Sequence, residues 1–281
     1  MRNESIQTSS LKTIMLPILV VAVAVVLVGY GATVLPPAVD WEGAFRPATL
    51  AIAHLENPYH GGFGFYNPPW TLLFLIPFAI DVEIGRAALL ILSLGIYGLV
   101  AVKMRAPLLA LIAFLISPPI MHTMLHGNVE WLALAGLLLP PRWGLFFVMI
   151  KPQIGGMVAV YWIVEAWRQG GWQRTVWLLW PVGTAFLASV ALFGLWPINA
   201  MATSDQWWNA SFWPYSIPFG LAALGWAISK RDIRGALIAS PCLSPHVLLH
   251  AWSGALLATT RNQWLTVLIV TLLWIVAFRN L

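Results

Sequence analysis

The sequence predicts an all-α protein that crosses a membrane many times. Hydrophobic residues make up 60% of the chain and charged residues only 9%, and the mean hydropathy is +0.81. A soluble domain carries roughly 25% charged residues. A chain this apolar needs lipid, not water, as its solvent. We therefore expect a single transmembrane domain over residues 1–281.

Apolar runs suited to membrane helices lie along the whole chain. A spanning helix needs about 20 apolar residues. The clear runs are 13–34, 86–102, 106–122, 143–167, 175–197 and 263–278. Shorter runs are 68–80, 129–140, 217–229, 235–250 and 251–259. Together they predict about ten membrane segments, with tilted, re-entrant or broken helices among the short ones.

Prolines interrupt several of these runs. They are Pro77, Pro118, Pro119, Pro152, Pro181, Pro241 and Pro245. Each one removes a backbone hydrogen bond and tends to break a helix. Broken helices in a membrane are tolerated only where they face protein or a water-filled cavity. The sequence therefore predicts an internal cavity rather than a plain helix bundle.

Two long polar stretches, 35–67 and 198–216, separate the apolar runs. Within the first, Ala44 to Leu55 has helical spacing, which predicts an amphipathic helix on the membrane surface. The second carries no Lys or Arg and contains three tryptophans, which is typical of an interface. Both stretches are expected to face outward.

The basic residues predict the orientation in a cell membrane, the inner or plasma membrane. Loops 168–174 and 230–234 are basic and are expected to be cytoplasmic, as is the N-terminus. Lys103 and Arg105 also favour the cytoplasm, whereas simple alternation of spans places them outside. A re-entrant segment at 68–80 would remove this conflict.

Several classes of site are disfavoured by composition. The net charge is +5, but no basic stretch is long enough for nucleic acid to be an expected partner. The single cysteine, Cys242, rules out an internal disulfide and a cysteine zinc site. Run 13–34 is too long for a signal-peptide core and lacks a small-residue cleavage site, so it is interpreted as a retained first helix.

Lys151 is the most unusual charge, because it interrupts the apolar segment FFVMIKPQIGGMVAVYW. An ionisable group within a membrane segment indicates function by default, and a lysine there can bind phosphate as a compact cation. The alternative is a lysine at a helix end, followed by Pro152, whose side chain extends to the surface. We favour the functional interpretation.

Asp40 directly follows the first apolar run. One interpretation is a helix N-cap, although Gly43 stands where a capping box would need Glu or Gln. The other is a general base at the boundary between membrane and water. Spacing alone does not separate the two.

Two pairs of histidines have helical i, i+4 spacing. His122 and His126 would share a helix face and such a pair can bind zinc. Gly127 is expected to end that helix, however, and no third ligand is evident, so metal binding is the less favoured interpretation. His246 and His250 are interpreted as hydrogen-bonded histidines lining a polar cavity.

Four segments taken together resemble the bacterial polyprenol-phosphate-mannose-dependent mannosyltransferases, membrane glycosyltransferases of the GT-C class. These segments contain Asp40 with Asn57-Pro58-Tyr59 and Tyr66-Asn67-Pro68-Pro69, then Gly127-Asn128-Val129-Glu130, Lys151-Pro152, and Ser244-Pro245-His246. Asn128 and Glu130 replace a Gln and an Asn of the family pattern. The chain is short for the family, so the resemblance is to a short or truncated member.

The resemblance implies an inverting transfer of a mannose-like sugar from a polyprenyl-phosphate donor to an acceptor glycan or glycolipid on the outer face. Asp40 would be the base. Substrate-binding residues would be Lys151, Arg46, Tyr59, Tyr66, Asn128, Glu130 and His246, with Trp207, Trp208 and Trp213 stacking on sugar or lipid. Lys151 is the first choice for the leaving phosphate, ahead of Arg46 and His246. No metal or other cofactor is implied, and membrane lipids are expected partners.

Two other functions remain open. The chain can be a non-catalytic subunit or scaffold of a larger complex that retains the GT-C fold. A transporter with a central site at its broken helices is less favoured, because no internal repeat supports it.

Overall fold

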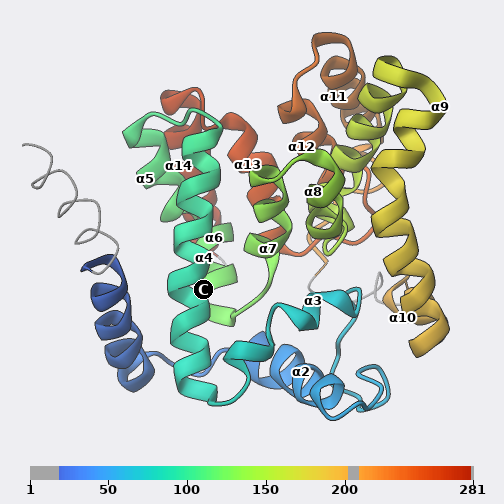
Figure 1. Cartoon of the computed structure of the whole chain (residues 1–281). Coiled ribbons are helices and arrows are strands. Elements are labelled where there is room, and N and C mark those ends of the chain that lie inside the picture. Colours follow the sequence, from blue (N-terminus) through green and yellow to red (C-terminus); the bar gives the residue numbers. More distant parts are fainter. Residues whose placement is uncertain (1–18, 202–208, 280–281) are drawn as a thin grey trace, which may run out of the picture.

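The protein is all-helical, as predicted. The computed structural model describes residues 19–201 and 209–279; helices account for 76% of these residues, and none of them forms a strand (Figure 1). The first helix is Leu19–Val34. The following elements are η1 (Trp41–Phe45), α2 (Arg46–Ala53), α3 (Trp70–Leu73), η2 (Ile76–Phe78), α4 (Val82–Lys103), α5 (Leu108–Leu115), α6 (Pro118–His126), α7 (Glu130–Ala135), η3 (Gly136–Leu138), α8 (Pro141–Val148), α9 (Pro152–Phe193), α10 (Trp196–Met201), α11 (Ile217–Lys230), α12 (Ile233–Cys242), η4 (Leu249–Trp252), α13 (Ser253–Thr259) and α14 (Gln263–Arg279).

Two helices, α4 and α9, are long and apolar enough to cross a membrane. Helices α5 and α6 together form a third candidate, bent by 48° between them. Shorter apolar helices are Leu19–Val34, α11 and α14. The membrane character of the chain is thus supported, and the number of about ten segments stays a prediction.

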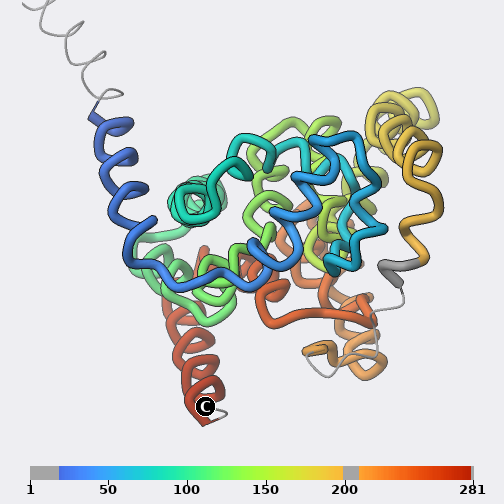
Figure 2. Tube along the Cα trace, turned by 90° about the horizontal axis from the view of Figure 1, so that it is seen from below, coloured from blue at the N-terminus to red at the C-terminus, as the bar shows by residue number. Residues whose placement is uncertain are grey.

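The first helix is apolar on every side and stands at the edge of the molecule (Figure 2). Val25 and Val26 are 65% and 69% exposed, and Tyr30 is 67% exposed. A helix that is hydrophobic all round belongs in a core or in a membrane. Because these side chains do not lie in the protein core, their surroundings are expected to be lipid.

Helix α9 is two helices joined at a sharp break. Gly170 and Gly171 have non-helical backbone angles, and Gly171 has a φ of 55°. Figure 1 shows the two halves meeting at the upper right, from where the second half descends toward α10. The break lies within the stretch 168–174 that the sequence predicts as a basic loop.

Three predicted runs are interrupted where the sequence carries proline. Run 143–167 is divided between α8 and α9, since Pro152 begins a new helix after Lys151 adopts a φ of −131° and ψ of 87°. Run 106–122 is divided between α5 and α6 before Pro118. Run 235–250 is helical only to Cys242, one residue after Pro241. These breaks agree with the predicted effect of proline, which lacks the N–H that continues a helix.

Basic and acidic residues gather at opposite ends of the molecule. The α4–α5 link, the α11–α12 link and the break in α9 lie at the upper end in Figure 1, and α2 and α10 lie at the lower end. Lys103 and Lys230 end α4 and α11, whereas Glu42 lies in η1 and Glu83 in the first turn of α4. We call these the basic end and the acidic end.

The fold of segment 68–80 bears on the position of Lys103. Segment 68–80 folds into α3 and η2, which have 4 and 3 residues and are too short to cross a membrane. Helix α4 therefore starts at the acidic end and delivers Lys103 to the basic end (Figure 1).

The predicted amphipathic helix is present but shorter and differently placed. Helix α2 ends at Ala53, and Leu55 lies outside it with a φ of 63° and 96% of its surface exposed. The buried face of α2 contains Ala48, Thr49 and Ala51. Including Leu55 in the apolar face was wrong, because the helix ends before that residue.

Candidate functional site

A large cavity opens between the acidic-end loops and the two halves of α9. Its volume is about 1460 Å³, which exceeds the roughly 300–1,000 Å³ of an ordinary small-molecule pocket. Polar side chains on its lining are Asp40, Tyr66, Asn67, His122, His126, Asn128, Lys151, Gln153, Ser244, His246 and His250. Segments far apart in the sequence therefore meet around one space.

The part of the cavity lining that α9 provides is largely apolar. It contains Ala159, Val160 and Ile163 of the first half of α9 and Leu179, Val182 and Phe186 of the second half. From Lys151 to Ile163, at 1.5 Å rise per residue, the first half extends about 18 Å. The cavity thus combines a polar region with an apolar wall that is long enough for a hydrocarbon chain.

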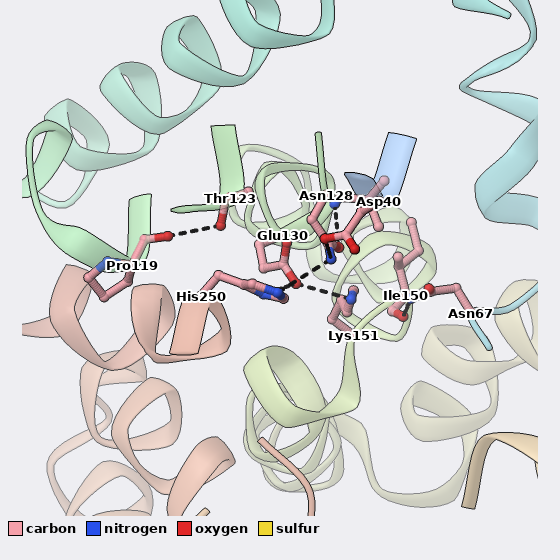
Figure 3. Close-up of polar contacts among 10 residues, drawn as sticks. Asp40, Asn67, Pro119, Thr123, Asn128, Glu130, Ile150, Lys151 and His250 are labelled. Atoms are coloured by element: carbon pink, nitrogen blue, oxygen red, sulfur yellow. Dashed lines mark hydrogen bonds and ion pairs between the residues drawn. The ribbon is translucent and has the colours of Figure 1, made fainter. Parts of the chain in front are cut away.

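Asp40 does not act as a helix cap. It precedes η1, but its backbone is already helical and its side chain forms no capping hydrogen bond. Instead, its Oδ2 accepts a hydrogen bond from Asn128 Nδ2 at 2.7 Å (Figure 3). The element that follows, η1, is a short π-helix, a form found frequently at functional sites. Of the two interpretations of Asp40, the structure removes the N-cap.

Gly127 allows the contact between Asp40 and Asn128. It ends α6 with a φ of 68°, as the sequence predicted for this glycine. A Cβ atom here would lie 2.6 Å from Cβ of Trp41, which is fully buried. Glycine is therefore favoured here both by the positive φ and by the lack of space for a side chain. The absence of a side chain allows the end of α6 to pack against the segment that contains Asp40.

Glu130 lies beneath the polar lining, with no exposed surface. Its Oε1 is 3.0 Å from Lys151 Nζ and 2.7 Å from His250 Nδ1 (Figure 3). A carboxylate this deeply buried is stable only when it is paired. Glu130 begins α7, Lys151 precedes α9 and His250 lies in η4, so the carboxylate joins three elements.

Asn128 links the two carboxylates through His250. Its Oδ1 accepts from Val129 N at 2.8 Å, so Nδ2 is the donor to Asp40. The same Nδ2 lies 3.4 Å from His250 Nε2. Asn128 therefore contacts both Asp40 and the imidazole that lies against Glu130, and Lys151 lies against the same Glu130 carboxylate.

Hydrogen bonds hold the loop before α3, which contains Tyr59 and Asn67, next to Lys151. Asn67 Nδ2 donates to the carbonyl of Ile150 at 2.8 Å, and the Tyr59 hydroxyl donates to the carbonyl of Asn67 at 2.7 Å. Burial raises the pKa of Tyr59, which keeps this hydroxyl a donor. Trp70 Nε1 donates to Phe146 O at 3.0 Å. These bonds hold Tyr66 at the cavity.

The structure brings five of the predicted site residues together. Asp40, Tyr66, Asn128, Lys151 and His246 all line the cavity. Lys151 is 5% exposed, so its side chain does not extend to the surface.

The other predicted site residues lie elsewhere. Glu130 supports Lys151 from below and has no surface for a ligand. Arg46 donates to the carbonyls of Ala79 and Ile80, at 3.0 and 3.4 Å, and is not on the cavity lining. Tyr59 stacks on Trp196 with ring centres 5.8 Å apart, behind the lining. Trp213 is 43% exposed, and Trp207 and Trp208 lie outside the described residues.

His250 lines the cavity, in agreement with its interpretation from the sequence, and Gln153 lines it as well, which the sequence did not predict. The spacing of His246 and His250 was the signal for the first. The helix assumed for this pair was wrong, since residues 243–248 are not helical. His122, whose ring centre is 3.8 Å from that of His126 and 5.3 Å from that of His250, completes a histidine cluster. Within the described residues, no group of three or more metal-ligating side chains is placed to hold a metal ion.

Comparison of the chain with protein-family models, with curated proteins and with solved structures gave no match in any of the three.

Proposed function

We propose that this protein is a membrane glycosyltransferase of the GT-C class that transfers a mannose-like sugar, with inversion, from a polyprenyl-phosphate donor to an acceptor glycan or glycolipid. The observation that carries the proposal is the shared cavity, in which Asp40 and Lys151 line the same space as a long apolar wall. A lipid-linked sugar phosphate needs a base, a cation and room for a hydrocarbon chain.

In this reaction Asp40 takes the proton of an acceptor hydroxyl as the oxygen attacks the anomeric carbon. A bond forms between the acceptor oxygen and the anomeric carbon, and the bond from that carbon to the phosphate oxygen breaks. The electron pair leaves with the polyprenyl phosphate. Asn128 orients the Asp40 carboxylate by its hydrogen bond to Oδ2.

The leaving phosphate requires a positive partner, because charge develops there in the transition state. Lys151 is that partner, and His246 and Gln153 line the same cavity as further hydrogen-bonding groups. The polyprenyl chain lies along the apolar wall between the halves of α9. Arg46 is not assigned to the phosphate, since its guanidinium already donates to two backbone carbonyls.

The proposed orientation places the acidic end, with Asp40, outside the cell and the basic end in the cytoplasm. Lysine and arginine accumulate on the cytoplasmic side of membrane proteins, and the basic end carries Lys103 and Lys230. The proposal keeps about ten membrane segments, with broken helices such as α5–α6 counted among them.

The experiment is a transfer assay with the full chain in membranes, supplied with a mannosyl polyprenyl phosphate and an acceptor glycolipid extract. Wild type is expected to transfer sugar, and Asp40→Asn to lose about 10²–10⁴-fold in rate. Asn keeps an oxygen that can accept from Asn128, so the fold should persist. Absence of transfer by wild type from any lipid-linked donor would rule out the enzyme, and full activity of Asp40→Asn would rule out the base.

A second candidate is a non-catalytic membrane subunit of a larger complex that retains the GT-C fold. The observation in its favour is the ion pair of Lys151 with the buried Glu130 at 3.0 Å, which already balances the lysine charge. In that case Lys151→Met combined with Glu130→Leu would preserve complex assembly, whereas an enzyme would lose transfer.

A further inference from the structure

Two arginines and three tryptophans form a cluster beside the break in α9, away from the cavity. The Arg142 guanidinium lies 5.1, 4.5 and 5.0 Å from the ring centres of Trp143, Trp177 and Trp180. The Arg174 guanidinium lies 4.3 Å from Trp177. Trp177 thus contacts both cations. We call these five residues the Arg–Trp cluster, and none of them lines the cavity.

No carboxylate in the described part of the chain pairs with the cluster. Within residues 19–201 and 209–279, neither Arg142 nor Arg174 forms an ion pair, although Arg168 pairs with Glu165 at 2.8 Å close by in sequence. The Nε atom of Arg142 is buried and has no hydrogen-bond partner among the described residues. A buried donor without an acceptor is costly, so the hydrogen bonds of the cluster are incomplete among the described residues.

The exposed tryptophans of the cluster are typical of a membrane boundary. Trp143, Trp177 and Trp180 are 48%, 42% and 51% exposed. Tryptophan side chains are enriched where the hydrocarbon core meets the headgroups. The cluster also lies beside the break in α9, at the basic end of the molecule (Figure 1).

An apolar stripe leads away from the cluster along the second half of α9. Val176, Trp180 and Leu187 are spaced by four and seven residues and so share one helix face. They are 39%, 51% and 70% exposed. The cavity is lined by a different set on the same helix, including Leu179 and Val182. The second half of α9 therefore has one face toward the cavity and another free to contact an acyl chain.

We propose that the Arg–Trp cluster is a binding site for an anionic phospholipid. The guanidinium groups of Arg142 and Arg174 hold the phosphodiester, and an acyl chain lies along Val176, Trp180 and Leu187. Arginine binds phosphate through a planar fork of donors and stacks on aromatic rings at the same time. Basic pockets between helices on the cytoplasmic side are typical sites for anionic headgroups. The apolar stripe favours a lipid over a free phosphate, and this site is independent of the proposed sugar transfer.

The test is native mass spectrometry of the full chain in a neutral detergent, with micelles doped with phosphatidylglycerol or with phosphatidylcholine of the same acyl chains. Wild type is expected to retain phosphatidylglycerol preferentially. Arg142→Ala and Arg174→Ala should each weaken retention about fivefold, and the double variant should weaken it about 25-fold, since a basic residue near an anionic headgroup contributes about that factor.

Two further variants distinguish specific binding at the Arg–Trp cluster from nonspecific attraction to the positive charge of the protein. Arg105→Ala removes an exposed arginine at the end of α4 that contacts no tryptophan ring in the described part of the chain, and it should retain lipid as wild type does. Arg142→Lys keeps the charge but loses the guanidinium fork, and it should fall well below Arg105→Ala. Circular dichroism of each variant checks that the fold is kept.

Three outcomes would overturn the proposal. The first is equal retention of the two lipids by wild type. The second is unchanged phosphatidylglycerol retention in the folded double variant, or in Arg142→Lys if the double variant does not fold. The third is displacement of the lipid by millimolar inorganic phosphate alone, which would assign the cluster to free phosphate instead.

Discussion

Lys151 Nζ lies 3.0 Å from Oε1 of Glu130, a carboxylate with no exposed surface. Glu130 begins α7 and Lys151 directly precedes α9. Among the described residues, Lys151 has no other ion-pair partner, and Glu130 has only His250 besides. Removing Glu130 leaves the Lys151 ammonium buried without a counter-charge, whereas removing Lys151 leaves Glu130 with His250 as its remaining partner. This asymmetry makes the pair testable.

Glu130→Gln is expected to destabilise the protein by about 3–5 kcal/mol, because it leaves the Lys151 ammonium buried without a counter-charge. Thermal unfolding of the detergent-solubilised chain, followed by tryptophan fluorescence, measures the change. The double variant Glu130→Leu with Lys151→Met should recover most of the lost stability and should not transfer sugar. A single variant as stable as wild type would contradict the buried pair.

Asn128→Ala is expected to lower the rate of transfer at least tenfold while the chain stays folded. The hydrogen bond from Nδ2 to the Asp40 carboxylate is charge-assisted, and such bonds contribute about 1.5–3 kcal/mol. Steady-state kinetics on membranes should show the loss in kcat rather than in KM. Thr123→Val is the matched control, since the Thr123 hydroxyl donates to Pro119 O and not to Asp40. An equal loss in both variants would remove the assigned role of Asn128.

Gly127→Ala is expected to destabilise the chain by more than about 1 kcal/mol. A side chain is unfavourable at a φ of 68°, and its Cβ would lie 2.6 Å from the buried Trp41. Gly98→Ala within α4 is the control, because nothing lies within 4 Å of its added Cβ and alanine favours a helix. The denaturation midpoint should fall below that of wild type for Gly127→Ala and rise above it for Gly98→Ala.

Asp232 provides a pH dependence outside the membrane segments. Hydrogen bonds from Arg234 lower the pKa of Asp232 below its ordinary value of 3.8. Its stabilising contribution is therefore complete above that value and is lost as the pH falls through the lower pKa of the folded state. Because both side chains are 22% exposed, we expect only about 0.2–1 kcal/mol. Asp232→Asn should lower the unfolding temperature at pH 7 and should match wild type at the lowest pH that both tolerate.

The all-helical class and the ends of several helices followed from the sequence because apolar length and terminal basic residues determine them locally. Runs 217–229 and 263–278 correspond closely to α11 and α14. The breaks beside Lys151 and after Cys242 were harder to place, because proline marks a break without showing on which side the chain turns.

The sequence identified several residues of the site, but it did not predict which of them contact one another. The sequence singled out Asp40, Asn128 and Lys151, but the two interpretations of Asp40 differ only by what its carboxylate contacts. Glu130 was expected to bind a ligand. Its burial beneath Lys151 results from the packing of α7 against α9, which cannot be predicted from the spacing of residues in the sequence. Arg46 was a candidate for the phosphate, and its bonds to the carbonyls of Ala79 and Ile80 depend on a turn that forms only in the folded chain.

The break at Gly170 and Gly171 separates the two arms of α9 that line the cavity. At 1.5 Å rise per residue, the break is about 28 Å along the helix from Lys151. The apolar wall is shared by the two arms that meet there, with Ile163 on one and Leu179 on the other. The angle between the arms is set by the backbone angles of these two glycines. The width of the apolar part of the cavity therefore depends on residues at the opposite end of the molecule from the carboxylate of Asp40.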